Sequence, residues 1–319
     1  MANFDVFNGD ADGICSLIQL RLADPRHATL ITGVKRDIKL LDQVSLREAE
    51  LVTTLDISME KNQASLKLLL EAEVGVFYAD HHRSGEIPNH PKLEAHINTS
   101  ADICTALIVN QFLKGRYLSW ALTAAYGDNL AHVATPLAED AGLSLTQINL
   151  MKELGTYVNY NGYGASLEDL FYPPAELYQL MSSHATPFDF IQKKPEVFQT
   201  LSQGYASDMS QAEKTQTYLQ NKRVAIYILP NEKWARRVSG VFSNRLANDF
   251  PDRAHAVLTK KDDRNYLVSI RAPKNTPQGA DEIALQFPTG GGRKTAAGIN
   301  NLSEKYITKL FEEIDQKYK

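Results

Sequence analysis

The chain has 319 residues, about twice the size of a common single domain, so its length favours two domains that each bury a core and excludes a disulfide-stapled miniprotein. Apolar residues make up 43% and charged residues 23%, which is ordinary for a globular chain and argues against extended disorder. With 34 Lys and Arg residues against 38 Asp and Glu residues, the formal net charge is −4, so the composition gives no sign of the broad basic surface that long nucleic acid requires.

Neither a membrane segment nor a secretory leader is expected. No apolar run approaches the roughly 18 residues that suggest a membrane span, and the start MANFDVFNGD lacks the charged-then-apolar pattern of a signal peptide. Cys15 and Cys104 lie in apolar surroundings without metal-type spacing, which favours buried thiols. We therefore expect a cytoplasmic protein with no membrane partner.

Short apolar strands alternate with amphipathic helices at the start of the chain, a rhythm that predicts a parallel sheet with helices on its faces. From Ala101 to about Met181 the pattern becomes mainly helical. The expected strands are Asn3–Phe7, Thr29–Thr32, Leu51–Leu55 and Val74–Tyr78, and the expected helices among them are Ile14–Leu22 and Lys61–Glu71.

A polar stretch with little apolar periodicity then separates this region from a second β-containing one. We expect an α/β fold with a parallel-sheet domain and a helical second half at 1–195, a linker or connecting helix at 196–214, and a smaller α/β domain at 215–319. In the smaller domain we expect strands at Arg223–Leu229, Ala254–Thr259 and Tyr266–Arg271 and helices at Val238–Asn248 and Ser303–Lys317.

Acidic residues recur directly after the predicted strands, where open parallel sheets bind their ligands. The first strand ends in Asn8-Gly9-Asp10-Ala11-Asp12-Gly13, the third in Asp56 and the fourth in Asp80-His81-His82, and Gly127-Asp128-Asn129 follows a helical stretch. For any one of these positions, capping of the next helix is at least as good an interpretation. Together, carboxylates with imidazoles favour a divalent metal site, with manganese as a suitable ion.

These motifs resemble, in order and spacing, those of the DHH phosphoesterases, and the resemblance spans nearly the whole chain. Asp80-His81-His82 is similar to the motif that names the family. Ser269-Ile270-Arg271 and the segment Gly290-Gly291-Gly292-Arg293-Lys294-Thr295-Ala296-Ala297-Gly298 are similar to substrate-binding elements of the DHH-associated domain. The resemblance implies a catalytic metal-binding domain followed by a substrate-binding domain.

The resemblance also implies a centre for Mn²⁺ or Mg²⁺. The ligands of one ion match Asp10, Asp56, His81 and Asp128. The second ion would be held by Asp56 and by Asn8, where relatives such as the RecJ exonucleases have Asp, and Phe4 stands where they have His. Because an amide brings no negative charge, we expect one firm metal site and one weaker site.

Several further residues take expected roles from the same resemblance. His82 matches the residue that contacts the reacting phosphate, and Asp80 is placed to orient an imidazole. Arg271 matches a residue that holds a substrate phosphate. The sequence has Arg293 where the family usually has His after the glycines, and its guanidinium suits the same phosphate contact with Gly290, Gly291 and Gly292, although a solvated arginine beside a glycine turn is the alternative. Lys35 and Arg36 are further candidates for phosphate binding or a plain exposed basic pair, and Asp12 is expected to support the ligands.

With its size and two-domain layout, the chain resembles the nanoRNases among the DHH phosphoesterases. This resemblance implies a metal-dependent phosphodiesterase, an oligoribonuclease that cleaves dinucleotides such as pGpG and short oligonucleotides to mononucleotides. A RecJ-like single-strand exonuclease is the first alternative, although it requires a long positive groove. A nucleotide-binding sensor without catalysis is the second, suggested by Asn8 and Arg293, and a manganese-type inorganic pyrophosphatase ranks lowest. We expect no long duplex nucleic acid as partner, and the sequence predicts neither an oligomeric state nor a base preference.

Overall fold

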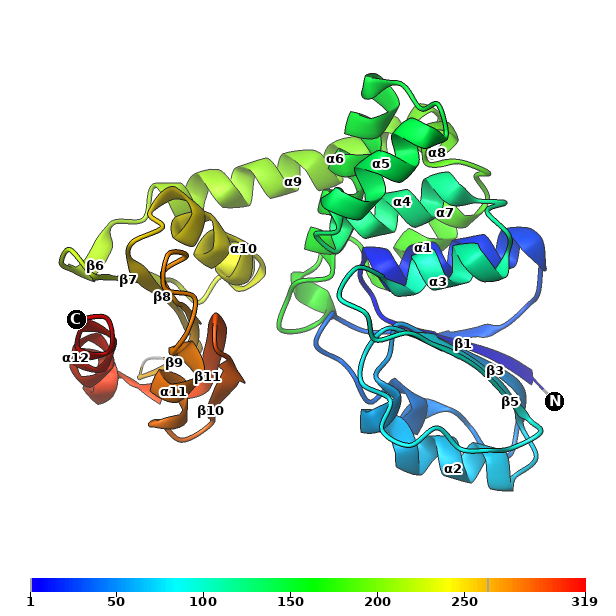
Figure 1. Cartoon of the computed structure of the whole chain (residues 1–319), viewed down its shortest axis with the longest axis horizontal. Helices are drawn as coiled ribbons and strands as arrows, with labels where there is room; N and C mark the ends of the chain where they lie inside the picture. The colour runs from blue at the N-terminus through cyan, green and yellow to red at the C-terminus, as the bar shows by residue number, and fades with distance from the viewer. Residues whose placement is uncertain (1, 263) are drawn as a thin grey trace. The chain divides into compact units, whose positions relative to one another are not determined.

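The protein folds into two compact units, residues 1–204 and 205–319, in a computed structural model that describes residues 2–262 and 264–319. The first unit holds a parallel sheet followed by helices, and the second holds a smaller mixed sheet with helices (Figure 1). The predicted α/β fold class is confirmed. Residues 196–214 coincide almost wholly with one helix, α9 (Pro195–Glu213), and the domain limits given from the sequence stay a prediction.

The sheet of the first unit has the strand order β2-β1-β3-β4-β5 and every described pairing in it is parallel. The edge strand β5 was missed from the sequence because its few residues, LEAHI, include the polar Glu94 and His96 and none of them is buried. The strands are β1 (Ala2–Phe7), β2 (Thr29–Ile31), β3 (Ala49–Leu55), β4 (Gly75–Asp80) and β5 (Leu93–Ile97).

Helices cover both faces of this sheet, because alternate residues of each central strand are apolar on opposite sides (Figure 1). Val76 and Tyr78 of β4 pack with the helix α2, whereas Ala79 packs with α1, α3 and α4. The α-helices are α1 (Ala11–Ala23), α2 (Gln63–Glu71), α3 (Thr105–Phe112), α4 (Leu118–Gly127), α5 (Ala131–Asp140), α6 (Leu145–Asn161), α7 (Pro174–Ser182) and α8 (Pro187–Lys193), with short 3₁₀-helices η1 (Leu40–Gln43), η2 (Met59–Asn62) and η3 (Leu167–Asp169). None of the helices in residues 2–262 and 264–319 is long and apolar enough to cross a membrane.

The sheet of the second unit has the order β10-β11-β9-β8-β7-β6, and only β7 and β8 pair in parallel within the part that the structure describes. One apolar cluster packs α11 and α12 against the sheet, and another packs α10 and the end of α9 against it. The elements are β6 (Thr217–Gln220), β7 (Val224–Leu229), α10 (Lys233–Asp249), β8 (Ala254–Lys260), β9 (Asn265–Arg271), α11 (Ala280–Leu285), β10 (Gly290–Arg293), β11 (Ala296–Ser303), η4 (Glu304–Tyr306) and α12 (Ile307–Lys317).

The glycine triplet does not form the turn that was one interpretation of its sequence. Gly290, Gly291 and Gly292 pair with β11 as the antiparallel strand β10. A Cβ atom on Gly290 would lie 1.8 Å from the carbonyl oxygen of Ala284, so the missing side chain lets this strand pass close to α11. At Gly290 the glycine is therefore explained by close packing against α11, and a contact of the glycines with a ligand stays a prediction.

One buried histidine ties the stability of the second unit to pH. His255 of β8 is fully buried, and Arg253 donates a hydrogen bond of 3.3 Å from Nε to its Nε2. Burial and the positive charge of Arg253 lower the pKa of His255 from 6.5 to about 4. The unfolded chain thus takes up a proton near pH 6.5 that the folded chain accepts only near pH 4, and protons favour unfolding in between.

We predict that acidification from pH 7 to pH 4 removes up to about 3 kcal/mol of stability through His255, because the full contribution is present only above pH 6.5. Denaturant titrations followed by tryptophan fluorescence measure this free energy at each pH. The variant His255→Gln should show a flatter dependence on pH than the wild type, and His27→Gln, which changes an exposed histidine, should keep the wild-type slope. Equal slopes in all three proteins would contradict the prediction.

Candidate metal centre

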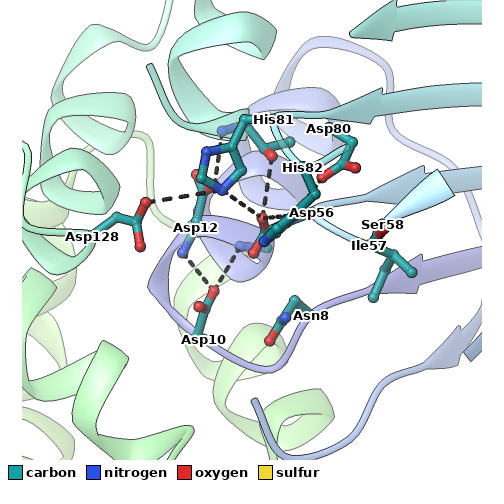
Figure 2. A network of polar contacts seen from close by, with 12 residues as sticks. Asn8, Asp10, Asp12, Asp56, Ile57, Ser58, Asp80, His81, His82 and Asp128 are labelled. Carbon is teal, nitrogen blue, oxygen red and sulfur yellow. Dashed lines mark hydrogen bonds and ion pairs between the residues drawn. The ribbon is translucent and has the colours of Figure 1, made fainter. Parts of the chain in front are cut away.

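Four sequence motifs meet at the carboxyl edge of the parallel sheet. The strands β1, β3 and β4 are neighbours, so the segments that follow them come together there. They carry Asn8 to Asp12, Asp56 and the Asp80-His81-His82 run, and Asp128 joins them from the end of α4 (Figure 2). The structure thus brings together all the residues of the first unit that the sequence proposed as metal ligands.

Asp10 is both a cluster member and the N-cap of α1. Its Oδ1 accepts hydrogen bonds from the backbone N–H of Asp12 at 2.9 Å and of Gly13 at 3.2 Å. A Cβ atom on Gly13 would lie 2.2 Å from the carbonyl oxygen of Asn8, so only glycine lets the chain turn this tightly into the helix. The capping and ligand interpretations of this aspartate are therefore compatible, since a carboxylate has four lone-pair sites.

Asp12 has a structural role that the sequence did not show. Its two carboxylate oxygens accept hydrogen bonds from the backbone N–H of Thr105 at 2.8 Å and of Ala106 at 2.7 Å. These groups open α3, so the carboxylate holds the N-terminus of that helix against the site. The two partners are 93 and 94 residues away in the chain, a separation that no local motif reveals.

His81 turns one ring nitrogen toward the carboxylates. Its Nδ1 lies 3.0 Å from the carbonyl oxygen of Ile103, which can only accept, so Nδ1 donates this hydrogen bond and Nε2 is the nitrogen placed to bind a cation. Nε2 lies 3.4 Å from Asp56 Oδ1, 3.8 Å from Asp12 Oδ2 and 3.9 Å from Asp128 Oδ2. The ligand atoms of Asp12, His81 and Asp128 are close enough together to share one ion, and so are those of Asp56, His81 and His82.

His82 is held by the third aspartate of this edge. Its Nδ1 makes a hydrogen bond of 2.7 Å with Oδ1 of Asp80, which is fully buried, and it lies 3.7 Å from Asp56 Oδ1. The hydrogen bond to Asp80 raises the pKa of His82 above its ordinary value, against the effect of burial. The His82 side chain is 45% exposed, so its imidazolium remains within reach of a bound molecule.

The carboxylates repel one another. Burial, followed by the charges of Asp12 and Asp10, raises the pKa of Asp56 well above its ordinary value. Burial and Asp12 raise the pKa of Asp128 to about 6.

Asp56 itself has a left-handed backbone conformation with φ of 58°, a strained geometry that aspartate tolerates better than most residues.

The donor set fits a divalent ion. Carboxylate oxygens with one imidazole nitrogen suit Mn²⁺ and Mg²⁺, and a divalent charge would offset the repulsion among the carboxylates. Two buried oxygens at this edge, Oδ1 of Asn8 and Oδ2 of Asp80, have no hydrogen-bond partner among the residues that the structure describes.

The two basic residues after β2 are placed differently from each other. Lys35 Nζ lies 2.6 Å from Asp10 Oδ2 and 3.9 Å from Asp128 Oδ1, whereas Arg36 is exposed. Burial lowers the pKa of Lys35, but the charges of Asp10, Tyr163 and Asp128 and the hydrogen bond to Asp10 together raise it above its ordinary value, so the ammonium stays charged. Burial likewise raises the pKa of Asp10, but the charge of Lys35 and the hydrogen bonds from Lys35, Gly13 and Asp56 together outweigh it, which leaves that pKa below its ordinary value.

In the second unit, Arg271 is fixed in place at the end of β9. Its Nε donates to Asn244 Oδ1 at 2.6 Å, and Nη1 donates to Ser269 Oγ and to the carbonyl oxygen of Ile270, both at 2.9 Å. Asn244, on α10, was not predicted from the sequence because nothing local links it to β9. Arg271 pairs in register with Ala296 of β11, and β10, with the exposed Arg293 at its end, follows on the other side of β11.

Solved structures of other proteins share this fold. No protein-family model matches the sequence, and no curated protein matches it either. The structure is similar to that of exonuclease RecJ bound to manganese, with a TM-score of 0.66 and 16% identity over 99% of this chain and 90% of that one. It is similar to RecJ in complex with Mn²⁺ from Thermus thermophilus, with a TM-score of 0.62 and 15% identity over 99% of this chain and 52% of that one, so it spans about half of that protein. It is also similar to PggH, a pGpG-specific phosphodiesterase from Vibrio cholerae, with a TM-score of 0.56 and 13% identity over 100% of this chain and 99% of that one. The resemblance to the DHH phosphoesterases and RecJ is thus confirmed in the fold.

We predict that His81→Gln weakens Mn²⁺ binding roughly a hundredfold, because it removes the nitrogen ligand that Ile103 orients. Equilibrium dialysis of the substrate-free protein measures the affinity. His132→Gln is the matched control, since His132 is exposed and pairs with Asp102 in the same unit. Wild-type affinity in the His81 variant would rule out this histidine as a ligand.

Proposed function

We propose that the chain is a metal-dependent phosphodiesterase that hydrolyses dinucleotides such as pGpG and other short oligonucleotides to mononucleotides. The observation that carries this proposal is the orientation of His81, whose Nε2 faces three carboxylates while its Nδ1 is fixed by Ile103. A structural histidine would not need so many acidic neighbours.

In this proposal the first unit binds the ion and the reacting phosphate. Asp10, Asp56, His81 and Asp128 would hold Mn²⁺ or Mg²⁺, and Asn8 would contribute a weaker, uncharged oxygen together with Asp56. When bound, a divalent ion supplies a Lewis acid that polarises the phosphoryl group and makes water acidic enough to attack at neutral pH.

In this proposal His82, held by Asp80, contacts the reacting phosphate. Asp80 fixes the ring of His82 through Nδ1, so Nε2 can donate to a non-bridging phosphate oxygen. The raised pKa of His82 keeps more of the imidazolium form at neutral pH, which favours this donation. His82 and Asp80 thus stabilise charge and do not hold the nucleophile.

We also propose that the second unit binds a terminal phosphate of the substrate. The Arg271 guanidinium is held by Asn244 and Ser269, so little side-chain freedom is lost when it binds an anion. The glycines of β10 and Arg293 would add backbone and guanidinium donors. Within the first unit, the exposed Arg36 is a separate candidate for a phosphate contact.

Short substrates are favoured by two observations. The acidic total charge does not provide a long basic track. The chain also matches PggH, which is specific for pGpG, along nearly the full length of both chains. A single-strand exonuclease activity is the second candidate, because the TM-score to RecJ is higher, at 0.66.

We expect the purified protein with Mn²⁺ to convert pGpG and pApA to mononucleotides, to act more slowly on a five-nucleotide RNA, and to leave long single-stranded DNA intact. Chromatography resolves the products. Asp56→Asn should reduce turnover to background, and Asp140→Asn, at an exposed position in the same unit, should not. Digestion of the long DNA would favour the exonuclease, and nucleotide binding without any product would favour a sensor.

Arg271→Ala should raise KM for a 5′-phosphorylated dinucleotide roughly tenfold to a hundredfold, and change it much less for the same dinucleotide without that phosphate. The exposed Arg264 of the second unit provides the control Arg264→Ala. Equal effects on both substrates would show that Arg271 does not recognise the terminal phosphate.

A further inference from the structure

A lysine ammonium lies on one side of the carboxylate cluster, and its main chain is fixed there. The backbone N–H of Lys35 donates to the carbonyl oxygen of Gly162 at 2.8 Å, and its own carbonyl oxygen accepts from Asn8 Nδ2 at 3.4 Å. The segment that carries Lys35 is thus held by the end of α6 and by the first motif residue.

The ammonium is surrounded by oxygen atoms of the kind that bind hard cations. Lys35 Nζ lies 2.6 Å from Asp10 Oδ2, donates to Asn159 Oδ1 at 2.9 Å and lies 3.9 Å from Asp128 Oδ1. The ring of Tyr163 approaches it at 5.6 Å from the centroid. Carboxylate and amide oxygens are also the ligands of Mn²⁺ and Mg²⁺.

With Lys35 in this position, both carboxylate oxygens of Asp10 already have partners. Oδ1 accepts two backbone N–H groups at the start of α1, and Oδ2 meets the ammonium. With two lone pairs on each oxygen, one site on Oδ2 is left, which is enough for one cation shared with the Asp56 and His81 side. A second ion near Asp10 would have to displace Lys35.

The contacts of Asn8 also argue against a second ion near Asp10. It is 6% exposed and neutral, and its Nδ2 is used to hold the Lys35 carbonyl. Its Oδ1 offers one uncharged oxygen, whereas a divalent ion of this type takes six or more oxygen ligands and favours charged ones. The charge that a second ion would bring to Asp10 and Asp128 is already supplied in part by Lys35.

We propose that the Lys35 ammonium supplies the positive charge that a second divalent cation would bring to Asp10 and Asp128, so that this centre binds one divalent ion and uses the lysine as its other positive charge. For catalysis, the inference rests on the proposed phosphodiesterase function: the ammonium, two of whose three donors meet Asp10 and Asn159, would neutralise a phosphate oxygen on that side. The metal content itself does not depend on that function.

The test is the number of Mn²⁺ ions bound per chain, measured by equilibrium dialysis on the full-length protein without substrate. We expect about one ion for the wild type and about two for Lys35→Met and for the double variant Asn8→Asp/Lys35→Met, because both open the Asp10 side and the double variant adds a carboxylate. Lys39→Met, which changes an exposed lysine on the same segment, should keep the wild-type value.

Electron paramagnetic resonance of the bound Mn²⁺ gives a second readout. An isolated ion gives a resolved six-line spectrum, and two ions about 4 Å apart, as in two-metal sites, couple and broaden it. We expect the wild type to show the first and the double variant the second. Circular dichroism checks that each variant is folded.

Two comparable Mn²⁺ ions in the wild type would overturn the proposal whether or not the variants fold. Unchanged binding in the folded Lys35→Met and double variants would also overturn it. A wild type that binds one ion but hydrolyses nothing would leave the metal count in place and refute the phosphodiesterase proposal instead, so the two failures are distinguishable.

Discussion

The structure of the first unit depends on how negative charge is tolerated at one edge of a parallel sheet. Asp10, Asp12, Asp56 and Asp80 are each 2% exposed or less, so water cannot screen their charges well. Several neighbouring groups supply positive charge or a hydrogen-bond donor. The helix N-termini, the two histidines and Lys35 are all arranged around this one electrostatic problem.

The compensation is unequal across the cluster. Asp10 and Asp12 are each bonded to the backbone N–H groups that open a helix, α1 and α3 respectively, and Asp10 has Lys35 as well. Asp56 and Asp128 have less support, and burial together with the neighbouring carboxylates raises their pKa values. The shortage of positive charge thus lies on the side of His81, and this is where a divalent ion gains most.

Local patterns in the sequence were enough to predict the strand ends and their convergence. Asp56 and the Asp80-His81-His82 run follow apolar strands, and the alternation of strands with helices fixes a parallel sheet, so the motifs had to share an edge. The fold class followed from the same rhythm.

The contacts that define the cluster were not predictable, because they join segments that are distant in the chain. Asp12 reaches Thr105, and Lys35 reaches Asn159 across 124 residues. Neither partner belongs to a motif, and a polar side chain on a helix carries no sign of what it faces. The glycines of β10 misled for another reason, since glycine composition does not distinguish a turn from a strand that passes close to a helix.

The double use of Asp10 and Asp12 limits how this centre can change over evolutionary time. A substitution at either position would alter the ion site and loosen a helix at once, so selection for stability protects both residues even where catalysis is relaxed. Asn8 and Lys35 cap no helix. Variation in metal requirement among descendants of this chain should therefore accumulate at these two positions, while the two helix-capping aspartates persist.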